Sequence, residues 1–122
     1  MVRALLVSHD EFAANCLKSV ESILGQMEEA VAISNRGCSL QTLKEQIAEH
    51  LPSEGEVVIF VDLLGSNFTA AKLCGKKNPV ICGFNLPMLI SFFTKRDKMP
   101  LEQLVKTVAA DGQRGIRVEY QQ

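Results

Sequence analysis

The feature of the sequence that most constrains the fold is an unbroken apolar run, Val-Val-Ile-Phe-Val, at residues 57–61. A strand with one face in water would alternate polar and apolar residues, and this run does not. A strand without alternation is typical of the middle of a parallel sheet whose two faces are covered by helices. The run therefore predicts an α/β fold built around a buried central strand.

Other short apolar runs, at residues 2–7, 30–34 and 79–83, predict three more strands. Between the strands, apolar residues recur at the spacing of an amphipathic helix. Helices are predicted at residues 11–24, 40–51 and 68–74, from residue 85 onward, and at residues 101–108. Strands that alternate with helices indicate a parallel sheet with right-handed crossover connections.

The C-terminal residues 115–120 alternate between polar and apolar side chains, which predicts an edge strand. The expected fold class is therefore α/β, an open, doubly wound, mostly parallel sheet of about four parallel strands plus this C-terminal edge strand. The chain of 122 residues contains no internal repeat, low-complexity tract or domain boundary, so residues 1–122 are expected to form a single domain.

Composition excludes several classes of function. A net charge of -1 with dispersed Lys and Arg argues against nucleic acid as a partner, because such proteins carry a basic surface. The most apolar stretches are only as long as a strand, so neither a secretory segment nor direct membrane insertion is expected, and the protein is expected in the cytoplasm. Two distant histidines and scattered acids do not form a metal-ligand set, and neither a metal nor another cofactor is expected.

The polar residues that follow the strands are the candidates for chemistry, because open parallel sheets bind ligands at the carboxyl ends of their strands. Three polar segments occupy such positions: residues 8–10, 62–67 and 85–87. If the strands lie side by side, the three segments meet on one rim of the sheet. This rim is the expected functional site.

His9 is the strongest single candidate. It lies between a strand and the N-terminus of a helix, where free backbone N–H groups favour an anion such as phosphate. Asp62 could accept a hydrogen bond from one ring nitrogen of His9 and leave the other nitrogen as a nucleophile. The turn formed by Gly65, Ser66 and Asn67 offers donors for phosphate oxygens, although the same residues also suit an ordinary strand-to-helix turn.

Three segments of the chain resemble the mannose/fructose-type IIA domain of the bacterial sugar phosphotransferase system. Leu-Leu-Val-Ser-His at residues 5–9, followed by Glu-Phe-Ala at 11–13, is similar to the phosphorylation segment of that family. Phe-Val-Asp-Leu-Leu-Gly-Ser at residues 60–66 resembles its aspartate loop, and residues 83–89 resemble its third signature. The segments occur in the family's order and at similar spacing, so the resemblance covers nearly the whole chain.

The resemblance implies that His9 is the phosphoacceptor, that Asp62 orients it and that Ser66 lies near the phosphoryl group. Proteins of this family take phosphate from the histidine phosphocarrier HPr and pass it to a IIB component, which phosphorylates the incoming sugar. They form dimers that exchange a C-terminal strand, for which residues 115–120 are the candidate here. Membrane components recognise the sugar, so this chain does not reveal which sugar is transported.

Two positions depart from the family pattern. The family usually has Gly directly after the histidine, where this chain has Asp10. Its aspartate loop usually reads Gly-Gly-Ser or Gly-Gly-Thr followed by Pro, where this chain has Gly65, Ser66 and Asn67. An inward Asp10 carboxylate would repel an incoming phosphoryl group, whereas an outward one could cap the following helix. A transfer-deficient regulatory relative is therefore an alternative.

Two further alternatives retain phosphoryl chemistry. The phosphocarrier subunit of dihydroxyacetone kinase has a similar domain and also uses a histidine. A receiver-like domain would instead be phosphorylated on Asp62, with Asp10 and Glu11 near a magnesium ion, but the chain lacks the lysine expected after the last strand.

Overall fold

The computed structural model describes residues 1–75 and 77–121. Its four strands form one parallel sheet in the order β2-β1-β3-β4. The strands are β1 (Arg3–Ser8), β2 (Ala30–Ser34), β3 (Val57–Val61) and β4 (Val80–Cys82). Strands β1 and β3 occupy the middle of the sheet, which confirms the central position predicted for residues 57–61.

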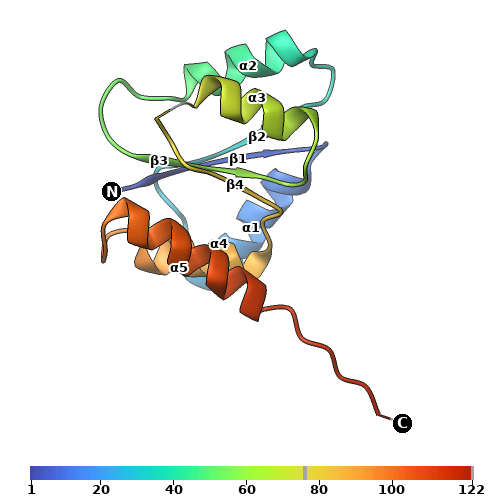
Figure 1. Cartoon of the computed structure of the whole chain (residues 1–122), viewed down its shortest axis with the longest axis vertical. Helices are drawn as coiled ribbons and strands as arrows, with labels where there is room; N and C mark the ends of the chain where they lie inside the picture. The colour runs from blue at the N-terminus through green and yellow to red at the C-terminus, as the bar shows by residue number, and fades with distance from the viewer. Residues whose placement is uncertain (76, 122) are drawn as a thin grey trace.

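Helices cover both faces of the sheet (Figure 1). Helices α2 and α3 lie on one face, and α1, α4 and α5 lie on the other. The helices are α1 (Phe12–Leu24), α2 (Leu40–Glu49), α3 (Ser66–Cys74), α4 (Leu86–Lys95) and α5 (Leu101–Arg114). The predicted doubly wound parallel α/β fold is thus confirmed, and α5 is longer than the helix predicted at residues 101–108.

Each face of the sheet has its own hydrophobic core, because successive residues of a strand point to opposite sides. Leu6 and Phe60 belong to the core beneath α1, α4 and α5, where the Phe60 ring meets the Phe92 ring edge-on, with 5.2 Å between centroids. Leu5 and Ile59 belong to the core beneath α2 and α3. The apolar residues of the two central strands therefore fill both cores and fix the sheet in place.

The predicted C-terminal edge strand does not form within this chain. Residues 116–121 extend away from the body of the molecule and have no strand partner in the described part of the chain (Figure 1). The apolar side chains Ile116, Val118 and Tyr120 are 70%, 86% and 78% exposed. An alternating sequence becomes a strand only where a neighbouring strand offers hydrogen-bonding groups, and the segment points away from the sheet.

Candidate functional site

The site lies at the carboxyl end of the sheet, where β1 and β3 end side by side. The two strands pair with Val7 opposite Val61, so the residues that follow them leave the sheet at neighbouring points. The backbone N–H of Asp62 donates to the Val7 carbonyl at 3.2 Å, which continues the ladder past the end of β3. The sheet thereby brings His9 and Asp62 into contact, although they are 53 positions apart in the sequence.

Two hydrogen bonds join His9 to one oxygen of Asp62. Oδ2 of Asp62 accepts the backbone N–H of His9 at 2.8 Å and lies 2.7 Å from Nδ1 of the ring. A carboxylate only accepts hydrogen bonds, so Nδ1 carries the proton in this pair. In the neutral ring, Nε2 is then the nitrogen with the lone pair. The His9 side chain is 52% exposed and the Asp62 side chain only 7%, so the ring faces solvent while its partner is buried.

The carboxylate of Asp62 accepts four hydrogen bonds. Besides the two from His9, Oδ1 accepts the backbone N–H of Leu63 at 3.0 Å and a side-chain N–H of Asn67 at 3.3 Å. Burial, the largest single influence, raises the pKa of Asp62. The hydrogen bonds from His9 and Asn67, together with the charge of the ring, outweigh it and bring the pKa below its ordinary value of 3.8. Asp62 is therefore ionised at neutral pH and held in one orientation.

Asn67 has a role that sequence reasoning missed. The sequence predicts a phosphate contact for Asn67, but its side chain is buried, at 1% exposed, and bonded within the protein. Its amide donates to Asp62, and its Oδ1 accepts a hydrogen bond at 3.3 Å from Nδ2 of Asn35, which follows β2. Any phosphate contact by Asn67 is thus left to its backbone N–H. No sequence signal distinguishes Asn35, because Asn is common in turns.

Gly65 and Ser66 form the start of α3, next to the His9 ring. Gly65 has φ 152° and ψ -151°, a backbone region that is almost restricted to glycine. Nδ2 of Asn67, in the first turn of α3, lies 3.4 Å from Nδ1 of His9. The first backbone N–H groups of a helix have no partners within the helix and carry partial positive charge. The first turn of α3 therefore lies beside the Nδ1 side of the His9 ring, and the side chain of Ser66 at its start is exposed.

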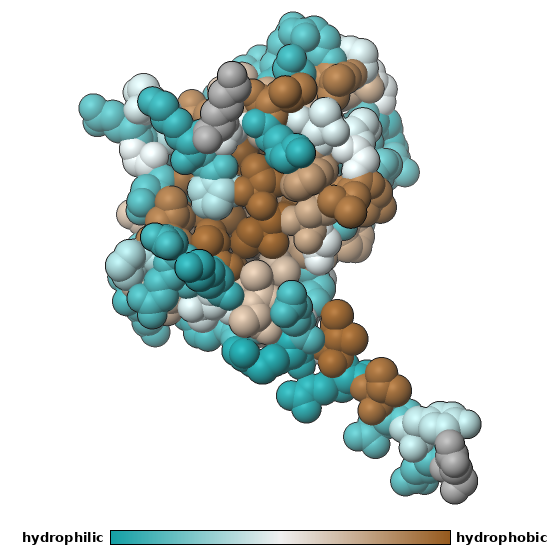
Figure 2. All heavy atoms as spheres, in the orientation of Figure 1, coloured by the Kyte–Doolittle hydropathy of each residue, from teal (hydrophilic) through white to brown (hydrophobic). Residues whose placement is uncertain are grey.

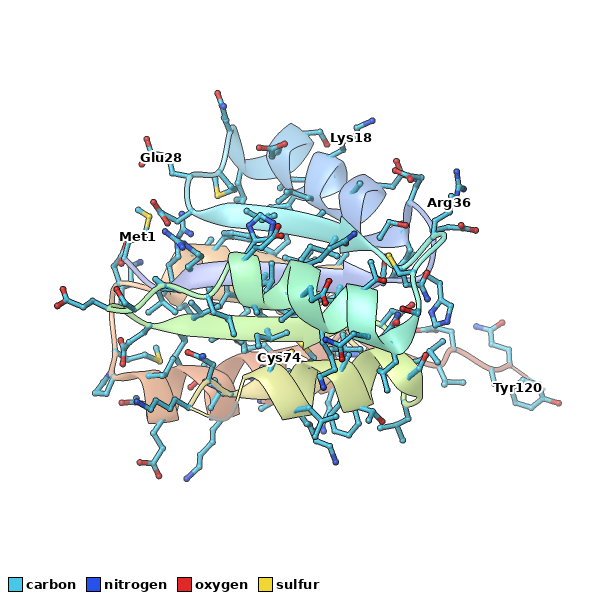
Figure 3. The ribbon with its side chains drawn as sticks, turned by 90° about the horizontal axis from the view of Figure 1, so that it is seen from above. Met1, Lys18, Glu28, Arg36, Cys74 and Tyr120 are labelled. Atoms are coloured by element: carbon cyan, nitrogen blue, oxygen red, sulfur yellow. The ribbon has the colours of Figure 1, made fainter. Side chains whose placement is uncertain are left out.

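Asp10 follows His9 in the left-handed backbone region, with φ 47°. Glycine adopts this region without strain, and Asp tolerates it better than most residues. Oδ1 of Asp10 accepts a hydrogen bond from Nε of Arg36 at 2.9 Å, and both side chains are exposed. Figure 3 shows Arg36 at the opposite end of the molecule from Met1. The Asp10 carboxylate is thus paired with a cation at the surface.

The side chain that caps the start of α1 is that of Ser8, and not that of Asp10. Oγ of Ser8 accepts the backbone N–H of Ala13 at 2.7 Å, and this hydroxyl is fully buried at the end of β1. The bond satisfies one of the free N–H groups in the first turn of α1. The residue before His9 therefore links the end of β1 to the first turn of α1.

In the third predicted segment, at residues 85–87, the side chain of Asn85 bonds to the backbone of two helices. Oδ1 of Asn85 accepts the backbone N–H of Met88 at 3.0 Å and so caps α4. Its Nδ2 donates to the carbonyl of Gly112 in α5 at 2.9 Å. Asn85 therefore links α4 to α5, and its amide is occupied by these two helices.

Residues 1–75 and 77–121 contain neither a metal-binding cluster nor a membrane-spanning helix. No cluster of three or more His, Cys, Asp or Glu side chains is arranged to hold a metal ion. None of the helices combines the length and the apolar character that crossing a membrane requires. The expectation of a metal-free and cofactor-free site stays a prediction.

The sequence matches a family model, EIIA-man, described as PTS system fructose IIA component, over residues 3–109. It is 26% identical over 126 residues to the PTS system fructose-specific EIIA component of Bacillus subtilis (strain 168), with 97% of this chain and 86% of the relative covered. The chain therefore belongs to the EIIA-man family, the IIA sugar phosphotransferase components of the phosphotransferase system.

Solved structures superpose on nearly the whole chain. The phosphotransferase system component EIIA from Streptococcus agalactiae superposes with a TM-score of 0.92 at 26% identity, and 97% of each chain is covered. The mannose/sorbose specific IIA subunit from Enterococcus faecalis gives a TM-score of 0.79 at 23% identity, with 98% of this chain and 96% of the other covered. The likeness to the Enterococcus faecalis structure shows a shared fold only.

Proposed function

We propose that the protein is a cytoplasmic phosphocarrier that accepts a phosphoryl group from HPr on His9 and passes it to a IIB component. The observation that carries the proposal is the pair formed by His9 and Asp62, in which Nδ1 is held by a buried carboxylate at 2.7 Å. This arrangement leaves the lone pair of the neutral ring on Nε2. The phosphoryl group is therefore expected on Nε2.

The transfer itself needs a nucleophile and a means of stabilising charge. The Nε2 lone pair forms a bond to phosphorus as the bond between phosphorus and the phosphohistidine nitrogen of HPr breaks. The ring of His9 becomes positively charged during this step, and the ionised Asp62 stabilises that charge through Nδ1–H. The donor's ring nitrogen takes back its electron pair. The second transfer, to the IIB component, reverses these roles.

The start of α3 is the expected cradle for the phosphoryl oxygens. Its first turn is next to the His9 ring, and the N-terminus of a helix favours negative charge. We assign the phosphate contacts to the backbone N–H groups of Gly65, Ser66 and Asn67 and to the hydroxyl of Ser66. The Asn67 side chain takes no part, because it is already bonded to Asp62 and Asn35.

The geometry at Asp62 favours His9 over Asp62 as the phosphorylated group. Each oxygen of Asp62 accepts two hydrogen bonds, which compete for its lone pairs with an attack on phosphorus. The oxygens of Asp62 are therefore poor nucleophiles for the receiver-like reaction, in which Asp62 itself would be phosphorylated. The alternative, the phosphocarrier subunit of dihydroxyacetone kinase, also uses a histidine, so the same geometry suits it.

The test is transfer of labelled phosphate from phosphoenolpyruvate through Enzyme I and HPr to the purified protein. Wild type should accept an acid-labile label, and His9→Ala should accept none. Asp10→Gly should behave like wild type, because the Asp10 carboxylate is paired with Arg36. Label that persists in His9→Ala would refute the proposal. Labelling that appears only in Asp10→Gly would instead favour the transfer-deficient regulatory relative.

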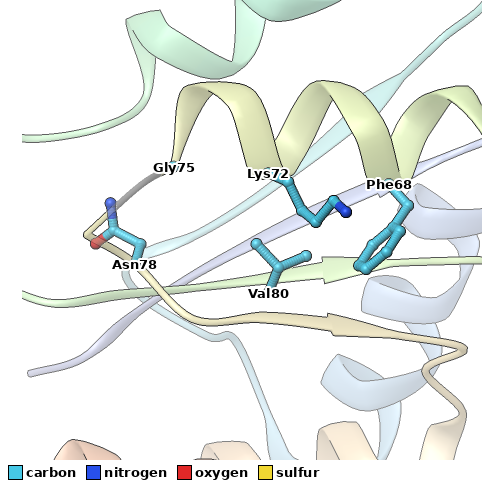
Figure 4. Close-up of a pocket in the computed structure, with 5 residues that line it drawn as sticks. All are labelled: Phe68, Lys72, Gly75, Asn78 and Val80. Carbon is cyan, nitrogen blue, oxygen red and sulfur yellow. The ribbon is translucent and has the colours of Figure 1, made fainter.

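We also propose a homodimer in which the candidate strand at residues 115–120 of one chain pairs with β4 of the other. β4 is one of the two edge strands of the sheet, with β2 at the other edge, and Figure 2 shows apolar residues gathered on the face of the molecule where the β4 edge lies. A hollow beside this edge, between α3 and β4, appears in Figure 4. It is lined by Phe68, Lys72, Gly75, Asn78 and Val80. A partner's alternating segment would cover the apolar surface on both sides of the edge.

A further inference from the structure

We propose that Asn67 and Asn35 form an amide relay that positions Asp62 and thereby keeps the proton of the neutral His9 ring on Nδ1. In the relay, Nδ2 of Asn35 donates to Oδ1 of Asn67, and Nδ2 of Asn67 donates to Oδ1 of Asp62. The donor and acceptor atoms are 3.3 Å apart in each bond. It deepens the proposed function, because it names the residues that prepare the nucleophile. Both asparagines act through Asp62 and are positioning residues.

The relay has a defined polarity. A side-chain amide has one accepting end and one donating end, and an ionised carboxylate only accepts. Asn35 donates to the oxygen of Asn67, so the NH₂ group of Asn67 is the end that faces Asp62. With the opposite orientation, the Asn67 oxygen would face the carboxylate and repel it. Asn35 therefore determines which end of the Asn67 amide reaches the site.

Burial makes the relay difficult to replace by water. Asn67 is 1% exposed, so its side chain has little access to solvent partners. Asn35 is itself held in place, because its backbone N–H donates to the Ser8 carbonyl at 3.0 Å. The relay thus connects the end of β2 to the start of α3 and to the residue that follows β3.

The relay acts on the tautomer of His9 through the orientation of one carboxylate. Oδ2 of Asp62 receives both bonds from His9, and Oδ1 receives those from Leu63 and Asn67. If the bond from Asn67 is lost, only the Leu63 N–H still holds Oδ1, so the carboxylate is less firmly oriented and holds Nδ1–H less firmly. The loss also removes one of the hydrogen bonds that lower the pKa of Asp62. A larger share of neutral rings would then carry the proton on Nε2, where it blocks attack on phosphorus.

The test is the tautomer of His9 in the free protein, measured from the imidazole ¹⁵N chemical shifts above the pH at which the ring loses its charge. Wild type should hold mainly the Nδ1–H form, and Asn67→Ala should move toward a mixture. Asn35→Asp should shift the tautomer more than Asn35→Ala, since a carboxylate at this position attracts the NH₂ group of Asn67 away from Asp62. A merely structural role predicts the reverse order, because Asp has nearly the shape of Asn.

Asn15→Ala is the matched control, since Asn15 is exposed on α1. It should leave the tautomer unchanged. Phosphate acceptance from HPr should fall about tenfold in Asn67→Ala, the effect of losing one hydrogen bond to a charged group. Equal tautomer populations in wild type and Asn67→Ala would overturn the relay. If wild type accepts no phosphate but Asn67→Ala still shifts the tautomer relative to wild type, the result supports the relay and counts only against the proposed function.

Discussion

At the scale of single residues, the site depends on how many hydrogen bonds one carboxylate can accept. An ionised carboxyl group offers about four acceptor positions, and the four donors to Asp62 come from His9, Leu63 and Asn67. When all of its acceptor positions are occupied by protein donors, a carboxylate gains no hydrogen bonds by turning toward solvent. The half-exposed ring of His9 is therefore oriented by a partner that is almost completely buried.

Replacing Asp62 by Asn should lower the free energy of unfolding at neutral pH by about 1 kcal/mol, because charge-assisted hydrogen bonds become neutral ones. Folding lowers the pKa of Asp62, so its ionised form contributes stability in full above the pKa of the unfolded chain, about 4. This contribution is lost as the pH falls through the lower pKa of the folded state. Urea denaturation of both proteins should show a difference that shrinks on acidification. A difference that widens would contradict the assignment.

At the scale of elements, Arg96 ties the C-terminal end of α4 to the amino end of the sheet. Its side chain is buried, at 6% exposed, and its Nη1 donates to the carbonyls of Glu28 at 2.9 Å and Val2 at 3.4 Å. The guanidinium also lies over the ring of Phe93, with 5.1 Å to the centroid. One side chain thus holds the segments that lead into β1 and β2.

Arg96→Met should therefore reduce the free energy of unfolding by about 1–3 kcal/mol, since it removes the Arg96 donor from the buried Val2 carbonyl and the partly buried Glu28 carbonyl. Lys98→Met changes an exposed residue nearby and should stay within about 0.5 kcal/mol of wild type. Chemical denaturation of wild type and both variants measures these differences in the free energy of unfolding. Equal stabilities would show that Arg96 does not support the fold in this way.

The sequence predicts a strand or helix when the pattern within the segment is sufficient. It does not predict a feature that depends on contact with a residue far away in the chain. The run at residues 57–61 predicts a buried strand because its composition alone excludes a solvent-facing side. Residues 115–120 alternate as a strand would, but strand formation also needs a neighbouring strand, which the sequence pattern does not supply. His9 and Asp62 were predicted because both follow buried strands. Asn35 and Asn67 were not predicted as positioning residues, because an Asn in a turn looks the same whether it faces solvent or a carboxylate.

At the scale of the whole molecule, the C-terminal tail is the part with least packing in a single chain. Removing the chain after Gly115 should leave the fold of the protomer intact, because the apolar side chains described there are exposed. The same deletion should convert the proposed dimer to a monomer, since it removes the segment that pairs with β4. Size-exclusion chromatography with light scattering distinguishes the two. A deletion variant that remains a dimer would contradict strand exchange.

The central claim, that the protein carries phosphate on Nε2 of His9, is tested most directly by NMR of the protein phosphorylated through HPr. The ³¹P signal and the coupling of phosphorus to the ¹⁵N-labelled imidazole ring identify the bonded nitrogen. The account predicts one phosphohistidine, with phosphorus bonded to Nε2 and the proton kept on Nδ1 beside Asp62. Phosphorus bonded to Nδ1, or a signal from an aspartyl phosphate, would contradict it.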